Sequence, residues 1–122
     1  IGIDNSIQNI ILAQLNSEFN KKKNIKFIRN RVEECFDNLV KSNISNKTLV
    51  VNPPRRGLYE NVLKSINENI DSIDEIIYIS CNIETLKRDL DLLNLQNKRI
   101  THIIPLNQFP NTEHYEIILK IE

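Results

Sequence analysis

Two side chains in the second half of the chain have types suited to nucleophilic and base chemistry. Cys81 follows an apolar run at residues 76–79, and Glu116 opens an apolar run at residues 117–119. Asn82 is a good N-cap for a helix that follows. A thiol at the start of a helix is stabilised as thiolate by the helix dipole and can attack an electrophilic carbon. A carboxylate that is partly desolvated can accept a proton. Taken alone, each residue also has a plain structural interpretation, as a small buried apolar residue or as an edge-strand charge that discourages aggregation.

A second candidate is the segment Asn52-Pro53-Pro54-Arg55-Arg56-Gly57. Its two prolines fix φ and favour extended backbone before them, which predicts a stiff platform at the end of a strand. Asn52 offers an amide that both donates and accepts hydrogen bonds. Arg55 and Arg56 have the chemistry to contact phosphate. A rigid strand-to-helix turn with solvated arginines explains the same residues equally well.

Asp4, Cys35 and His114 are further residues whose types could bind a ligand or react. Asp4 ends a strand-like run, where a carboxylate can accept ribose hydroxyl groups or can cap the helix that follows. Cys35 lies on the apolar face of a helical pattern and is assigned to the core. His114, with Glu113 and Glu116, matches no standard metal spacing, so no metal site is predicted.

The elements that must position these residues alternate along the chain. Strands are predicted at residues 1–4, 25–29, 48–51, 73–80, 100–106 and 115–121, and helices at 6–20, 32–41, 58–70 and 83–95. This alternation predicts an α/β fold with a mostly parallel sheet covered on both faces. The continuous apolar run at residues 76–79 is typical of a strand buried on both faces. In such sheets ligands bind outside the carboxyl ends of the strands, where Asp4, Asn52 and Cys81 lie.

Composition narrows the function classes. The 122 residues, 40% hydrophobic and 26% charged, fit one soluble globular domain. No apolar run reaches the ~18 residues of a membrane span, and no signal peptide opens the chain. Two cysteines form neither a disulfide framework nor a zinc site, which favours a reducing, cytoplasmic setting. The 16 basic and 16 acidic residues cancel, so a strongly basic phosphate-binding surface is not expected in this chain.

Three segments, in this order, resemble three motifs of the RNA uracil-5-methyltransferases. They are Val51-Asn52-Pro53-Pro54-Arg55-Arg56-Gly57, Ser80-Cys81-Asn82-Ile83-Glu84-Thr85-Leu86, and Phe109-Pro110-Asn111-Thr112-Glu113-His114-Tyr115-Glu116. One such string would be a weak signal, whereas three at the expected separations are specific. The resemblance runs from Ile1 to the end of the chain and covers the second half of that family's catalytic domain.

The resemblance implies a Rossmann-like S-adenosylmethionine-dependent methyltransferase sheet with an antiparallel last strand. It implies transfer of a methyl group to uracil C5 in tRNA or rRNA, with Cys81 as nucleophile and Glu116 as proton acceptor. Asp4 would bind the cofactor ribose, and Asn52 would lie at the cofactor and the target base. Such an enzyme has RNA as its partner and S-adenosylmethionine as its cofactor.

Several positions depart from the family pattern, and two motifs resemble those of one branch of the family. Many members have Asp where this chain has Asn52, Ile83 replaces a frequent Pro, and Asn107 replaces a frequent Asp. The branch that acts on large-subunit (23S) rRNA resembles this chain in having Asn-Pro-Pro-Arg-Arg-Gly and Thr-x-His-Tyr-Glu. That branch is therefore the nearest resemblance.

The family also has a preceding strand with a Gly-rich cofactor turn, which this chain lacks. The chain has two glycines, neither in such a turn, and it does not begin with Met. We expect residues 1–122 to be the C-terminal part of a catalytic domain whose N-terminal part supplies that strand, between the strand ending at Asp4 and the one ending at Asn52. Unpaired strand edges are costly, so the fragment alone is expected neither to fold well nor to methylate.

Two alternative functions remain open at this stage. Asn-Pro-Pro followed by an aromatic residue marks methyltransferases of exocyclic amines, although Arg55 stands at the aromatic position here. A catalytically inactive methyltransferase-like module that binds RNA or a partner is the other. Loss of activity on Cys81→Ser argues against the first, and binding of S-adenosylmethionine argues against the second.

Overall fold

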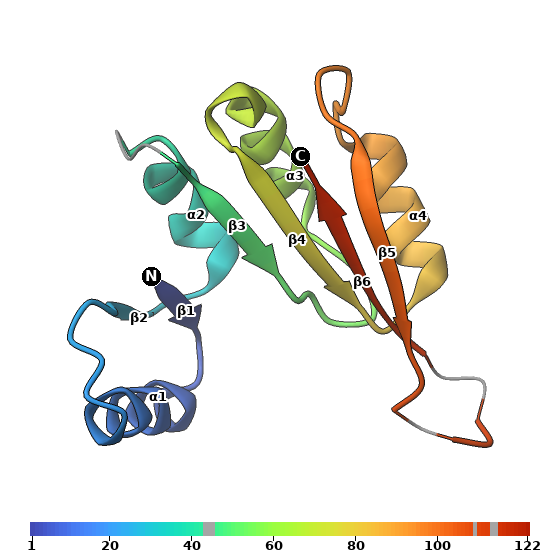
Figure 1. Ribbon diagram of the computed structural model, residues 1–122. Coiled ribbons are helices and arrows are strands. Elements are labelled where there is room, and N and C mark those ends of the chain that lie inside the picture. The colour runs from blue at the N-terminus through green and yellow to red at the C-terminus, as the bar shows by residue number, and fades with distance from the viewer. Residues whose placement is uncertain (43–45, 109, 113–114) are drawn as a thin grey trace. The chain divides into compact units, whose positions relative to one another are not determined.

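The computed structural model describes residues 1–42, 46–108, 110–112 and 115–122 (Figure 1). The elements are β1 (Gly2–Asp4), α1 (Ile7–Phe19), β2 (Phe27–Arg29), α2 (Val32–Val40), β3 (Thr48–Val51), α3 (Glu60–Glu68), the 3-10 turn η1 (Ile70–Ser72), β4 (Glu75–Ser80), α4 (Ile83–Leu92), β5 (Ile100–Leu106) and β6 (Glu116–Ile121). The predicted alternation of strands and helices is confirmed. Two compact units divide the chain, Ile1–Leu39 and Val40–Glu122.

The first unit is built on a two-stranded parallel sheet. Strand β1 pairs with β2, from Gly2 opposite Phe27 to Asp4 opposite Arg29. Helix α1 connects the two strands, as a parallel pair requires. The Asn30 N–H donates to the Asp4 carbonyl at 3.1 Å, which closes the end of the pair next to the candidate carboxylate.

Helix α1 has defined ends and an exposed apolar side. The Ser6 hydroxyl caps its N-terminus by accepting the Asn9 N–H at 3.3 Å. Ile10 is buried, whereas the apolar residues that predicted the helix by their four-residue spacing are exposed, namely Ile7, Ile11, Leu15 and Phe19. The predicted helix is therefore confirmed, and its apolar stripe is left uncovered within the described residues.

The second unit is built on a four-stranded mixed sheet in the order β3-β4-β6-β5. Strand β3 is parallel to β4, and β6 is antiparallel to both β4 and β5. This is the predicted α/β sheet with an antiparallel last strand. Because β6 is antiparallel to β4, its first residue and the last residues of β4 lie at the same edge of the sheet.

The core of the second unit lies on one face of this sheet. Figure 1 shows α3 and α4 on the same side of it. Its members include Val62, Leu63, Ile66, Ile73, Ile76, Tyr78, Leu86, Leu119 and Ile121. Along β4, buried Ile76, Tyr78 and Ser80 alternate with half-buried residues. The prediction that this strand is buried on both faces is therefore wrong, because the described helices of this unit cover one side only.

Two further predictions differ from the structure in their details. Helix α3 begins at Glu60 rather than at Leu58, whose N–H donates to the Asp89 carboxylate at 2.7 Å and so stays outside the helix. Cys35 was assigned to the core, but it is half-buried and its thiol lies 3.4 Å from the Arg31 carbonyl. Phe36 is the buried residue at this point of α2.

Candidate active site

Three predicted site residues lie at one edge of the four-stranded sheet. Val51, the last residue of β3, pairs with Tyr78, so Asn52 follows at the level of Ile79. Cys81 comes directly after the last residue of β4, and Glu116 is the first residue of β6. The three strands therefore bring an amide, a thiol and a carboxyl group to the same edge. This is the edge at which open α/β sheets bind their ligands.

Cys81 and Glu116 occupy neighbouring positions in the strand register. Ser80 pairs with Ile117 as the outermost pair of the antiparallel β4–β6 ladder. One step further along the same register lie Cys81 and Glu116. Both side chains are half-buried rather than enclosed. A thiol walled off inside the core would have excluded nucleophilic chemistry, and the structure does not place it there.

The turn that carries Cys81 is fixed by its two neighbours. The Ser80 hydroxyl accepts the Asn82 N–H at 3.1 Å and donates to the Asn82 carbonyl at 2.9 Å. The Asn82 side-chain oxygen caps α4 by accepting the N–H groups of Glu84 and Thr85, at 2.9 and 3.3 Å. The predicted cap by Asn82 is confirmed. The thiol thus lies between the end of a strand and the positive end of a helix dipole.

The segment after β3 forms a tight turn with an exposed tip. The Gly57 N–H donates to the Pro54 carbonyl at 2.8 Å, which closes a four-residue turn around Arg55 and Arg56. Gly57 has a φ of +80°, in the region that favours glycine. Asn52, Arg55 and Arg56 are exposed, and the Arg56 guanidinium lies 3.8 Å from the centroid of the Tyr59 ring. Two cations therefore project from the predicted platform.

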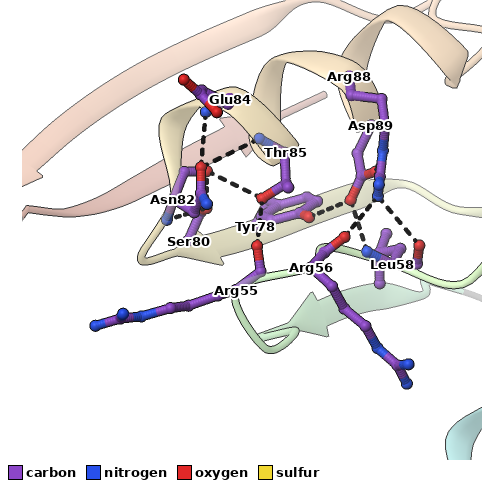
Figure 2. Close-up of polar contacts among 10 residues, drawn as sticks. All are labelled: Arg55, Arg56, Leu58, Tyr78, Ser80, Asn82, Glu84, Thr85, Arg88 and Asp89. Atoms are coloured by element: carbon purple, nitrogen blue, oxygen red, sulfur yellow. Dashed lines mark hydrogen bonds and ion pairs between the residues drawn. The ribbon is translucent and has the colours of Figure 1, made fainter.

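Side chains of α4 hold this turn in place, and sequence reasoning missed them. The Leu58 N–H and the Tyr78 hydroxyl both donate to Asp89, at 2.7 and 2.5 Å, and Arg88 pairs with the same carboxylate at 2.5 Å (Figure 2). Asp89 is fully buried. Its spacing from Leu86 and Leu93 places a carboxylate on the apolar stripe of the helix. A carboxylate on the apolar side of a helix could have predicted this cluster from the sequence, because a buried carboxylate needs hydrogen-bond partners.

The same cluster changes the chemistry of Tyr78. Burial raises the pKa of the Tyr78 hydroxyl far above its ordinary value, and the hydrogen bond to Asp89 raises it further. The phenol therefore stays protonated and acts as a donor. It has no part as a base at neutral pH.

Asp4 lies in the first unit, where it organises the turn into α1. One carboxylate oxygen accepts the Ser6 N–H at 2.7 Å, and the other accepts the Asn9 amide at 3.0 Å. The Asn9 amide, and then the Ser6 N–H, lower the pKa of Asp4. The alternative in which Asp4 itself caps the helix is wrong, because Ser6 is the N-cap. Its carboxylate is ionised and keeps lone pairs for further donors.

The second cysteine contrasts with Cys81. Burial, and then the Glu34 carboxylate, raise the pKa of the Cys35 thiol. A raised pKa reduces the thiolate fraction that reacts as a nucleophile. Between the two thiols, the position of Cys81 at the strand edge is the one suited to nucleophilic attack.

The described residues contain neither a metal-binding group nor a membrane-spanning helix. No group of three or more His, Cys, Asp or Glu residues there is arranged to hold a metal ion. His114 and Glu113, which were weighed as ligands, lie outside the described residues, as does Phe109. None of the described helices has the length and apolar character needed to cross a membrane.

Known proteins resemble this chain in sequence and in fold. A tRNA/tmRNA (uracil-C(5))-methyltransferase of Sulfurimonas denitrificans is 36% identical over 128 residues, covering 95% of this chain and 33% of that protein. An uncharacterized RNA methyltransferase of Clostridium acetobutylicum is 36% identical over 110 residues, covering 90% and 24%. The crystal structure of the Pyrococcus abyssi tRNA (uracil-54, C5)-methyltransferase in complex with S-adenosyl-L-homocysteine superposes with a TM-score of 0.76 at 32% identity, covering 99% of this chain and 28% of that one.

The matches cover nearly all of this chain but only part of each relative. It spans about a quarter to a third of the length of these relatives. The family described as tRNA (uracil-5-)-methyltransferase matches residues 3–122. The predicted Rossmann-like methyltransferase fold is confirmed by the solved relative. This chain belongs to the tRNA (uracil-5-)-methyltransferase family.

Proposed function

We propose that the protein carrying this chain transfers a methyl group from S-adenosylmethionine to C5 of a uridine in tRNA or rRNA, through a covalent adduct with Cys81. One observation supports this most strongly. The register of β4 and β6 brings Cys81 and Glu116 to neighbouring positions at the ligand-binding edge of the sheet. Membership of the uracil-5-methyltransferase family supplies the substrate class.

The reaction needs a nucleophile and a base because uracil C5 is a poor nucleophile. The Cys81 thiolate adds to C6, the C5–C6 double bond opens, and electron density moves to C5 and the C4 oxygen. C5 then bonds to the methyl carbon of S-adenosylmethionine while the bond from that carbon to the donor sulfur breaks, which leaves S-adenosylhomocysteine. Glu116 removes the C5 proton, the double bond re-forms, and the Cys81–C6 bond breaks to release the thiolate. The two side chains must therefore reach adjacent ring carbons, as neighbouring strand positions allow.

The described residues fit a role in holding the methyl donor. S-adenosylmethionine supplies an electrophilic methyl group and has a ribose with two hydroxyl groups. Asp4 is the last residue of β1, and its ionised carboxylate can accept ribose hydroxyls. The exposed amide of Asn52 follows β3 and can accept or donate at the cofactor and the target base.

The exposed arginines fit an RNA substrate. Arg55 and Arg56 project from the turn beside Asn52, and their guanidinium groups match phosphate oxygens. The ring of Tyr59 restricts Arg56 and so reduces the conformational entropy that Arg56 loses on binding. The target uridine must be extruded or come from a loop, because C6 is shielded in a stacked helix.

Residues 1–122 form the C-terminal part of a larger catalytic domain in this proposal. The relatives are three to four times longer than the stretch they share with this chain. In the described sheets, β1 pairs only with β2 and β3 pairs only with β4, so each has one unpaired edge. Pairing with further strands of the protein would satisfy these edges. The fragment alone would then be unstable and inactive.

A trapping experiment on the full-length protein tests the proposed chemistry. RNA containing 5-fluorouridine is incubated with the protein and S-adenosylmethionine, and the mixture is run on a denaturing gel. Fluorine cannot leave C5 as a proton, so the Cys81 adduct should persist and should map to the peptide containing Cys81. Separate tRNA and rRNA transcripts identify the substrate class.

Cys81→Ser is the matched control for this experiment. It should form no adduct and should not methylate uridine, while it still binds S-adenosylmethionine. Full methylation by Cys81→Ser would contradict the proposal and favour an exocyclic-amine methyltransferase. A wild-type protein that binds neither S-adenosylmethionine nor RNA would favour an inactive module.

A further inference from the structure

Helix α4 joins two parts of the candidate site that lie far apart in the sequence. Its first turn follows Cys81, and three of its side chains bond to the backbone of the turn after β3 (Figure 2). The Thr85 hydroxyl donates to the Arg55 carbonyl at 2.9 Å, and Arg88 donates to the Arg56 carbonyl at 2.9 Å. Asp89 accepts the Leu58 N–H at 2.7 Å. We call Thr85, Arg88 and Asp89 the α4 clamp.

The α4 clamp bonds to main-chain atoms and leaves the side chains of the turn exposed. Figure 2 shows the Arg55 and Arg56 side chains pointing away from the clamp, while their carbonyl groups face α4. The clamp therefore fixes where the turn lies without using the groups that would meet a substrate. It connects the exposed arginines to the helix that begins at Ile83, two residues after Cys81.

Close packing makes this connection rigid. Asp89 is fully buried, and both its oxygens are engaged by the Tyr78 hydroxyl, the Leu58 N–H and Arg88. A Cβ added at Gly57 would lie 2.6 Å from the Asp89 Oδ2 atom and 2.5 Å from the Arg88 Nη2 atom. The turn can approach the carboxylate this closely only because residue 57 is glycine.

We propose that Thr85, Arg88 and Asp89 are positioning residues, which hold the Asn52–Gly57 turn at a set place relative to Cys81 so that RNA bound by the turn presents its uridine to the thiol. This inference rests on the function proposed above and adds residues to it. Misplacement of a reacting group by about 1 Å costs on the order of 100-fold in rate. The clamp therefore matters to catalysis well beyond its share of fold stability.

Thr85 offers the cleanest test because its hydroxyl is half-buried and can be removed at constant shape. In the full-length protein, Thr85→Val should lower kcat/KM for RNA by roughly tenfold, mainly through a higher KM, because the Arg55 carbonyl loses its donor. Thr85→Ser keeps the hydroxyl and should stay within about twofold of wild type. The affinity for S-adenosylmethionine and the melting temperature of Thr85→Val should change little.

Tyr78→Phe is the matched structural control. It removes a buried hydrogen bond to the same Asp89 carboxylate, but it removes no bond to the turn. It should lower the melting temperature and leave kcat/KM within about threefold of wild type. A merely structural clamp predicts the reverse ranking, because the buried bond would then matter more than the half-buried one.

The outcomes separate this inference from the proposed function. Wild-type adduct formation on 5-fluorouridine RNA, together with an unchanged kcat/KM in Thr85→Val, overturns the positioning role alone. So does Thr85→Ser being as impaired as Thr85→Val, or Tyr78→Phe losing as much activity as Thr85→Val. A wild-type protein that forms no adduct with RNA overturns both proposals.

Discussion

The two backbone turns of the candidate site, one around Cys81 and one after β3, are held by different means. The turn around Cys81 is fixed by side chains one residue away, since the Ser80 hydroxyl bonds to the Asn82 main chain and the Asn82 side-chain oxygen accepts the first N–H groups of α4. The turn after β3 is fixed by side chains about 30 residues further along the chain. The thiol is thus placed locally, whereas the exposed arginines are placed by tertiary structure. Thr85 also bonds to the Asn82 carbonyl at 3.3 Å, so a change in the α4 clamp should move the turn after β3 more than the turn around Cys81.

Removal of the Asp89 carboxylate should cause the largest loss of stability, because it removes the tertiary contacts of the turn after β3. Asp89→Ala leaves the Leu58 N–H, the Tyr78 hydroxyl and Arg88 without their shared acceptor. We expect a loss of about 2–4 kcal/mol in unfolding free energy, measured by urea denaturation of the full-length protein. Asp91→Ala changes an exposed carboxylate on the same helix and should lose less than about 0.5 kcal/mol. Equal losses in the two variants would contradict the clamp.

A side chain at Gly57 should have the next largest effect. Gly57→Ala combines an unfavourable φ of +80° with a Cβ atom 2.6 Å from Asp89. The expected loss is about 1–3 kcal/mol, with weaker RNA binding and an unchanged reactivity of Cys81 towards a small thiol reagent. Gly2→Ala is the control, because its Cβ meets only the Phe27 ring at 3.0 Å. A Gly57→Ala protein as stable as wild type would show that the turn is not held tightly.

Loss of the local cap should have a smaller effect and should act on the other turn. Asn82→Ala removes the acceptor for the first N–H groups of α4, at a cost of about 1 kcal/mol. Adduct formation with 5-fluorouridine RNA should slow, while the affinity for RNA stays close to that of wild type. Asn82→Ser retains a capping oxygen and should recover most of the rate. If Asn82→Ala weakened RNA binding without slowing adduct formation, the turn around Cys81 would hold RNA and would not set the position of the thiol.

The Asp4 turn, a third local arrangement, gives the smallest expected effect. The pKa of Asp4 is lower in the folded protein than its ordinary value of 3.8, so ionised Asp4 stabilises the fold at pH values above 3.8. This contribution is lost as the pH falls through the lower folded-state pKa. NMR titration should show the Asp4 pKa below 3.8, and Asn9→Ala should raise it, because the Asn9 amide is the largest cause of the shift. An Asp4 pKa that Asn9→Ala leaves unchanged would show that the amide does not engage the carboxylate.

The same division between local and tertiary contacts explains what the sequence could predict. The strand at Thr48–Val51 and the cap at Asn82 depend on short-range patterns, and both were predicted. The approach of α4 to the Asn52–Gly57 turn depends on contacts across 30 residues, which periodicity does not encode. The partial exposure of Ile77 and Ile79 likewise depends on which helices cover the sheet. The order of three motifs predicted the candidate residues, but it could not predict the register that makes Cys81 and Glu116 neighbours.

The roles of Cys81 as nucleophile and Glu116 as base are tested most directly with ordinary uridine RNA and the Glu116→Gln variant of the full-length protein. With S-adenosylmethionine present, Cys81 should still add to C6 and C5 should still take the methyl group, but the C5 proton has no base to remove it. We expect a covalent protein–RNA complex on a denaturing gel that carries the methyl group and is abolished by a second change, Cys81→Ser. Normal turnover by Glu116→Gln, or a complex that survives Cys81→Ser, would contradict it.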